Sequence, residues 1–197
     1  MSLISFPEAP VPASIDWKVN QPTQANRSEF SKKRRVTILA AAPRLHARVT
    51  LPRILGEENV FEWRAFVVDC DGKANRFKLI ACERDQLTGV APVVAGAGQA
   101  GRTLQTSGWG TPGLKLKRGQ FFTVDEQLLI LMQNVVADEN GNATLRFKPY
   151  LRVVPANGAS LEVKRPYAVM SMSSDDTGWL ADVGQEYGVS FDCEESF

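Results

Sequence analysis

The stretch from Lys117 to Lys164 constrains the fold more than any other part of the chain, because apolar residues there alternate with polar ones in short runs. Turn-forming residues separate these runs about every ten residues, which is typical of a small antiparallel β-barrel or sandwich. Asn140 and Gly141 give the strongest hairpin signal, since both residues adopt positive φ at little cost. The predicted strands of this module cover residues 121–124, 128–136, 143–154 and 160–164.

One helix is expected before this module. Glu57 and Glu58 place negative charge where a helix N-terminus favours it, and Gly72 follows as a stop signal. Between these signals, apolar residues recur at helical spacing: Val60, Trp63, Val67 and Cys70.

The rest of the chain also favours β-structure. Runs of period two predict further strands at 15–19, 36–40, 46–51, 77–82, 167–172 and 187–194. We expect the last of these strands to pair with the N-terminal sheet. The chain is therefore predicted to be mainly β, with a first domain of residues 1–85 completed by 166–197, and an inserted small antiparallel barrel of residues 86–165.

The composition is that of an ordinary globular protein. The chain has 197 residues and a formal net charge of +1, which argues against a protein dedicated to binding nucleic acid or membrane surfaces. No apolar run approaches the roughly 20 residues of a membrane-spanning helix, and the N-terminus lacks the pattern of a secretory signal. The cysteines Cys70, Cys82 and Cys193 lie far apart, so buried free thiols are expected rather than disulfides or a zinc site.

A basic run, Lys32, Lys33, Arg34 and Arg35, precedes the predicted strand at 36–40. One interpretation is a contact with phosphate or DNA. The other is a solvated strand entry whose charge discourages pairing at a sheet edge. The near-neutral chain favours the second interpretation.

A GxGxxG motif at Gly96, Gly98 and Gly101 follows an apolar run, and Asp125 stands where a ribose-binding acid would be wanted. A dinucleotide site needs a helix directly after these glycines. Residues 102–113 contain further glycines and a proline that break such a helix. No cofactor is therefore expected.

Other catalytic and metal-binding patterns are incomplete. His46 is the only histidine and lies in a strand pattern, and no GxSxG motif is present. Acid-rich segments at 69–72 and 138–142 resemble calcium loops but lack the full ligand spacing, so turn formation explains both. We predict no catalytic, cofactor-binding or metal-binding residues, and no enzymatic activity.

Two segments carry a resemblance to a known family. Residues 96–101 and 104–109, GAGQAG and LQTSGW, resemble a segment in tail proteins of long-tailed bacteriophages. Residues 116–124 resemble the strand that follows it there, with Gln120 where Asp is commoner. The resemblance continues through residues 136–145, 149–152 and 155–158, and similar hairpins occur in β-modules of phage capsid proteins. The helix with Trp63, followed by Phe77, resembles the N-terminal β-sandwich of distal tail proteins.

The resemblance covers about residues 57 to 170 and implies a distal tail protein or a related minor tail protein. Such proteins have a ring-forming β-sandwich, and some members carry an OB-like β-barrel attached to it. They form a ring, commonly a homo-hexamer, at the tail tip of the virion, after synthesis in the host cytoplasm. The implied partners are the tail tube, the hub and the fibres or receptor-binding proteins. No membrane partner is implied, and nucleic acid is expected only as DNA passing through the lumen. Residues 32–35 would face that DNA if they line the lumen rather than the outer face, and the sequence leaves both placements open.

The N-terminal arm and the C-terminal strand are the expected contacts between ring subunits, so deletion of residues 1–13 is expected to weaken assembly more than folding. A ligand- or carbohydrate-binding module without catalytic activity is the alternative. Exposed aromatic platforms would support it, and the candidates are Trp109, Tyr150 and Trp179. Each tryptophan is otherwise expected to fill a core. An enzyme would require a cleft with perturbed titratable groups.

Overall fold

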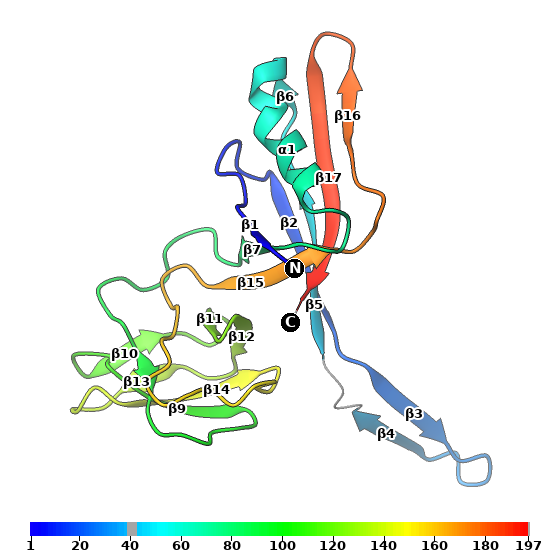
Figure 1. Cartoon of the computed structure of the whole chain (residues 1–197). Coiled ribbons are helices and arrows are strands. Elements are labelled where there is room, and N and C mark those ends of the chain that lie inside the picture. Colours follow the sequence, from blue (N-terminus) through cyan, green and yellow to red (C-terminus); the bar gives the residue numbers. More distant parts are fainter. Residues whose placement is uncertain (39–42, 197) are drawn as a thin grey trace. The chain divides into compact units, whose positions relative to one another are not determined.

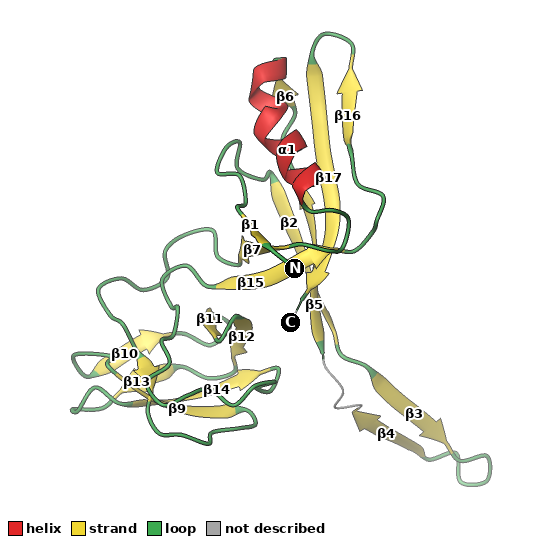
Figure 2. Ribbon diagram, viewed as in Figure 1, coloured by secondary structure: helices red, strands yellow, loops and turns green. Residues whose placement is uncertain are grey.

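The computed structural model describes residues 1–38 and 43–196. The predicted mainly β class is confirmed: strands make up 43% of the chain, and a large mixed sheet accompanies a curled antiparallel half-barrel (Figures 1 and 2). In chain order the elements are β1 (Leu3–Ile4), β2 (Ser14–Asn20), β3 (Thr23–Arg27), β4 (Arg34–Ile38), β5 (Arg44–Thr50), β6 (Ile54–Leu55), η1 (Glu57–Val60), α1 (Phe61–Asp69), β7 (Arg76–Ile80), β8 (Val93–Val94), β9 (Thr103–Ser107), β10 (Gly113–Leu116), β11 (Phe121–Val124), β12 (Gln127–Leu131), β13 (Val135–Ala137), β14 (Ala143–Lys148), β15 (Tyr167–Met172), β16 (Trp179–Asp182) and β17 (Glu186–Glu195).

The chain divides into two compact units. Unit 1 contains residues 1–77 and 170–196, and unit 2 contains residues 78–169. The chain leaves unit 1 within β7 and returns to it within β15. The predicted division, with residues 86–165 as a separate module, stays a prediction.

The large sheet is organised around β17. Its strand order is β1-β7-β15-β17-β5-β2, and β17 also pairs with the short strands β6 and β16. The pairing of β1 with β7 is parallel, whereas β17 is antiparallel to β5, with Phe191 opposite Val49. The last strand therefore pairs with N-terminal strands, as its alternating pattern predicts.

Aromatic side chains fill the core of unit 1. Phe66 of the helix lies 5.2 Å from Phe77 and 5.8 Å from Phe191, measured between ring centres. Phe6 joins this cluster at 5.2 Å from Trp63. Figure 1 shows α1 running alongside β17, so the helix provides the apolar layer that covers one side of the sheet.

The helix lies where the sequence predicts it, at residues 57–69, with a first turn of 3-10 geometry. The expected apolar face is confirmed, because the following residues are all buried: Val60, Trp63, Val67 and Cys70. The chain turns at Asp71 and Gly72, both of which have positive φ.

The N-terminal arm is part of the fold of its own unit. Besides the contacts of Phe6, the indole Nε1 of Trp63 donates a hydrogen bond to the carbonyl of Ala9 at 3.1 Å. The backbone N–H of Ala13 donates to Thr50 at 2.8 Å. These contacts favour a role in folding for residues 1–13, in contrast to the expected role mainly in assembly.

Unit 2 contains a five-stranded antiparallel sheet with the order β11-β12-β14-β9-β8. The turn between β11 and β12 has only two residues, Asp125 and Glu126, both with positive φ. The predicted hairpin at Asn140 and Gly141 precedes β14, and Gly141 has a φ of 72°. The core of unit 2 includes the fully buried rings of Phe122 and Phe147, whose centres lie 5.4 Å apart.

A segment without its own regular strand closes this sheet. Ser160 bridges Val93 at one edge, and Glu162 bridges Thr123 at the other. The backbone of Glu162 both donates to and accepts from Thr123 at 2.9 Å. The predicted strand at 160–164 is therefore reduced to two bridges, yet it joins both edges of the half-barrel.

Two predicted strands are shorter than expected. The run at 128–136 divides into β12 and β13, and β13 pairs with β10 in a separate ribbon. The run at 143–154 ends at Lys148, because Pro149 lacks the N–H that a continuing strand needs. The predicted strand at 36–40 forms through Ile38, and its last residues lie outside the described part of the chain.

Candidate interaction surfaces

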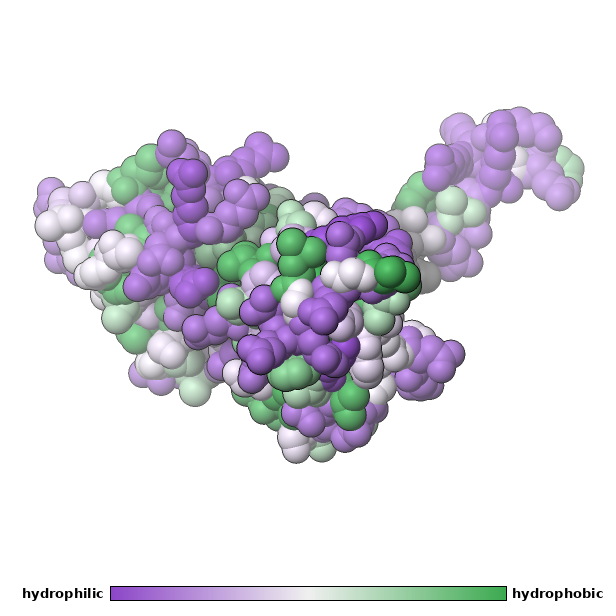
Figure 3. Space-filling model, turned by 90° about the horizontal axis from the view of Figure 1, so that it is seen from above, coloured by the Kyte–Doolittle hydropathy of each residue, from purple (hydrophilic) through white to green (hydrophobic). Residues whose placement is uncertain are grey.

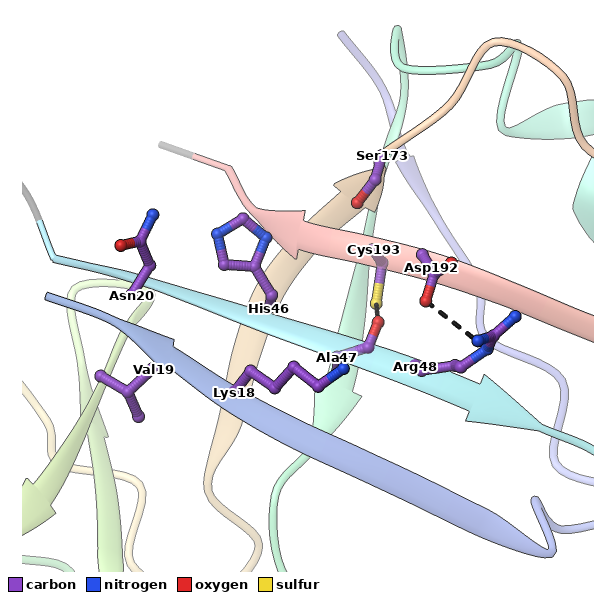
Figure 4. Close-up of a pocket in the computed structure, with 9 residues that line it drawn as sticks. All are labelled: Lys18, Val19, Asn20, His46, Ala47, Arg48, Ser173, Asp192 and Cys193. Atoms are coloured by element: carbon purple, nitrogen blue, oxygen red, sulfur yellow. Dashed lines mark hydrogen bonds and ion pairs between the residues drawn. The ribbon is translucent and has the colours of Figure 1, made fainter. Parts of the chain in front are cut away.

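A hollow in unit 1 lies on its sheet, where β2, β5 and β17 are adjacent, and has a volume of about 440 Å³. Figure 4 shows the side chains that line it, among them Lys18, His46, Arg48 and Asp192. Lys18 lies directly opposite His46 in the strand register, and Arg48 lies opposite Asp192.

The charges in this hollow are already paired. Lys18 Nζ lies 3.4 Å from Asp16, and Arg48 Nε lies 3.7 Å from Asp192. All four side chains are at least 60% exposed, so these ion pairs contribute little to stability. The hollow is therefore lined by solvated charges that are paired with one another.

The cysteine at this hollow, Cys193, has a buried and protonated thiol. The Cys193 thiol donates a hydrogen bond to the Ala47 carbonyl at 3.3 Å, and burial raises its pKa to about 12. Burial, assisted by the charges of Asp69 and Asp71, also raises the pKa of Cys70 to about 12. Both thiols therefore stay protonated at neutral pH, and a protonated thiol is a poor nucleophile and metal ligand.

The glycine motif forms a closed loop. Gly96, Gly98 and Gly101 all have positive φ, at 101°, 75° and 92°. The side chain of Gln99 fills the loop, donating to the Ala95 carbonyl at 2.9 Å and accepting from the Gln105 N–H at 2.6 Å. The loop is followed by strand β9, whereas a dinucleotide site needs a helix at this point. The loop therefore lacks the helix N-terminus that would bind a pyrophosphate.

The acid-rich hairpin is held by its own backbone. Asp138 accepts hydrogen bonds from the N–H groups of Asn142 at 2.8 Å and Asn140 at 2.9 Å. These hydrogen bonds lower the pKa of Asp138. Among the described residues, no group of three or more His, Cys, Asp or Glu side chains could hold a metal ion.

The three aromatic platform candidates have different environments. Trp109 is completely buried, and its Nε1 donates to the hydroxyl of Thr106 at 2.7 Å, so it fills the core. Tyr150 is half-buried. Trp179 is 42% exposed, and the Arg64 guanidinium lies 5.4 Å from its ring centre.

The most exposed part of unit 1 is a β-ribbon that we call the basic hairpin, residues 23–38. Among the described strands, β3 and β4 pair only with each other, and every residue from 23 to 37 is exposed. Within the described residues, the hydrogen bonds of this hairpin join its own residues to one another. Phe30 in its loop is fully exposed.

The basic hairpin concentrates positive charge. It contains one carboxylate, Glu29, and five cations: Arg27, Lys32, Lys33, Arg34 and Arg35. None of these cations forms an ion pair with a described residue. The sequence analysis identified the basic run at 32–35 but not the uncovered ribbon around it. The apolar Phe30 within a polar segment was the one signal that could have indicated it.

A second exposed surface lies at one end of the same unit, and we call it the acidic end. It consists of β6, residues 57–62, β16 and the turn into β17. Gly56 N–H donates to the Gln185 carbonyl at 3.0 Å and so joins its two halves. The acidic end presents five carboxylates, Glu57, Glu58, Glu62, Asp182 and Glu186, beside the cations Arg53 and Arg64.

Apolar side chains are also exposed at the acidic end. Leu55 is 62% exposed, Leu180 is 61% exposed, and Val183 is fully exposed. Phe61 is half exposed beside Arg64, whose guanidinium lies 5.9 Å from its ring centre. Figure 3, which looks onto this end, shows hydrophobic residues among hydrophilic ones. The sequence analysis did not identify this surface, because its residues come from segments about 120 positions apart.

Comparisons of the chain with protein families and with curated proteins found no match. No protein-family model matches the chain, and no curated protein matches it significantly. None of the helices in the described residues is long and apolar enough to cross a bilayer.

Proposed function

We propose that this protein is a structural subunit of a homo-oligomeric assembly and has no catalytic activity of its own. The basic hairpin is the observation that carries this proposal. A two-stranded ribbon is marginally stable by itself in water, and this one is uncovered on both faces. Contacts with another chain would supply the packing that the ribbon lacks within its own unit.

Within this class, we infer a ring at the tail tip of a long-tailed bacteriophage. The ring would join the tail tube to the hub and carry fibres or receptor-binding proteins. Two segments support this inference by their resemblance to phage tail proteins: residues 96–109 and residues 136–145. A mainly β chain that contains a large mixed sheet and a curled half-barrel is compatible with such a ring subunit.

The solution mass of the purified protein tests the proposal. Light scattering over a concentration series is expected to show a closed oligomer near six copies of the 21.7 kDa chain. A closed ring keeps one mass over a range of concentration, whereas an open filament grows with it. A monomer at every concentration would contradict the proposed function.

A carbohydrate-binding module is the second candidate, and the partial exposure of Trp179 is the observation that favours it. Its ring already faces Arg64, which leaves less of the aromatic surface for a sugar. Binding to a glycan array that is lost in Trp179→Ala, with a monomeric protein, would favour this candidate over the ring.

A further inference from the structure

We propose that the basic hairpin of one copy of this chain docks on the acidic end of the next copy. This inference rests on the proposed function and names the two surfaces that would meet in the oligomer. Both surfaces belong to unit 1, and both are exposed in the single chain.

The two surfaces have opposite charge. The basic hairpin carries five cations and one carboxylate, whereas the acidic end carries five carboxylates and two arginines. The net charge of the whole chain is only +1, so the charge is separated between surfaces rather than absent. Complementary potentials steer association and fix the orientation of the partners.

Each surface also contains like charges held directly opposite each other. Arg27 lies opposite Arg34 in the hairpin register, and Asp182 lies opposite Glu186 at the acidic end. Like charges in this arrangement destabilise a strand pair. Glu186 is relieved in part by an ion pair with Arg53, and docking of the hairpin would relieve the remaining repulsion on both surfaces.

Apolar side chains accompany the charges on both surfaces. The basic hairpin exposes Phe30 and half of Val36, and the acidic end exposes Leu55, Leu180 and Val183. Strand β16 is also an edge strand, because it pairs only with β17 among the described strands. An uncovered edge with apolar side chains is a site where another chain adds readily.

The two surfaces are different, so in the proposed ring each copy uses its hairpin toward one neighbour and its acidic end toward the other. Such heterologous contacts form a ring when their rotation closes. A reciprocal dimer would make the same contact twice, and the solution mass distinguishes it from a ring. A second copy of the chain is therefore the occupant that fits both surfaces at once.

Charge reversal on one surface tests the contact. The double variant Arg27→Glu with Arg34→Glu is expected to raise the dissociation constant of the oligomer about tenfold or more, because attraction becomes repulsion. The double variant Glu58→Arg with Asp182→Arg is expected to do the same. The readout is sedimentation velocity of the full chain, and circular dichroism confirms that each variant is folded.

Combination of the two reversals provides the decisive result. A chain that carries all four substitutions again presents opposite charges, so its oligomer is expected to recover. The matched control is Lys117→Glu with Arg118→Glu, which makes the same change of charge on unit 2. This control is expected to keep the wild-type mass.

The possible outcomes separate the two proposals. A monomeric wild-type protein overturns both the ring and this contact. An oligomeric wild-type protein whose mass is unchanged in the reversed variants overturns the contact alone. The same holds if the fourfold variant fails to recover. If the hairpin reversal keeps the oligomer but abolishes binding of a duplex DNA probe in a mobility-shift assay, the hairpin contacts nucleic acid instead.

Discussion

At the scale of single residues, glutamine amides hold the unit 2 backbone together. The side chain of Gln86 accepts from the Phe121 N–H at 3.0 Å and donates to the Phe121 carbonyl at 2.9 Å. Gln99 pairs in the same way with both backbone groups of Gln105. The Gln86 amide thus takes the place of a neighbouring strand beside Phe121, whereas the Gln99 amide adds to the hydrogen bond that the Gln105 carbonyl accepts from the Ala95 N–H. Sequence alone does not reveal this role, since it depends on which backbone groups lie within reach.

Replacement of Gln86 by leucine tests this role. Gln86→Leu is expected to lower the free energy of unfolding by about 1–2 kcal/mol, because both backbone groups of Phe121 lose their side-chain partner. Gln133→Leu is the control, since Gln133 is exposed and makes one long hydrogen bond of 3.4 Å. Chemical denaturation should show a change within about 0.5 kcal/mol for the control. Equal effects of the two substitutions would contradict the role of Gln86.

At the scale of elements, the segment 159–162 closes the half-barrel although it forms no regular strand. Its alternating sequence predicts a strand at 160–164, and the structure retains only the bridges of Ser160 and Glu162. The apolar alternation is nevertheless used, because Leu161 and Val163 are buried in the barrel core. The pattern therefore predicted which side chains face the core better than it predicted the length of the strand.

The closing segment can be opened by proline. Glu162→Pro removes the N–H that donates to Thr123 and is expected to cost about 1–3 kcal/mol, because the buried acceptor loses its partner. Glu162→Gln keeps this N–H and keeps a side-chain oxygen for the N–H groups of Lys164 and Arg165, which the carboxylate accepts at 2.8 Å, so it is the control. Hydrogen exchange of the Thr123 amide should accelerate more in the proline variant. If both variants exchange alike, the bridge does not hold the barrel closed.

At the scale of the whole molecule, both chain ends complete unit 1. Phe6 packs on the aromatic cluster, and β17 forms the centre of the large sheet. Neither end is therefore free to serve only a neighbour. The sequence left open whether the N-terminal arm is tucked into its own core, and the contacts of Phe6 and Trp63 decide this for the single chain.

Deletion of residues 1–13 is accordingly expected to impair folding. It removes β1, the ring of Phe6 and the acceptor of the Trp63 indole, at a cost of about 3 kcal/mol or more. Thermal unfolding measures the effect, and Phe6→Ala should reproduce a large part of it. A deletion variant that melts like the full chain would show that these contacts add little stability.

The sequence by itself determined the β class, the helix with its buried face, the turn between the strands predicted at 121–124 and 128–136, and the turn at Gly141. These features depend on local periodicity and on residues that accept positive φ, so they can be predicted from neighbouring positions. Only the tertiary structure decided that β17 lies at the centre of the sheet, that residues 159–162 join both edges of the half-barrel, and that the basic hairpin is left uncovered. Those features depend on which distant strands meet, and that is set by packing of the whole chain rather than by any one segment.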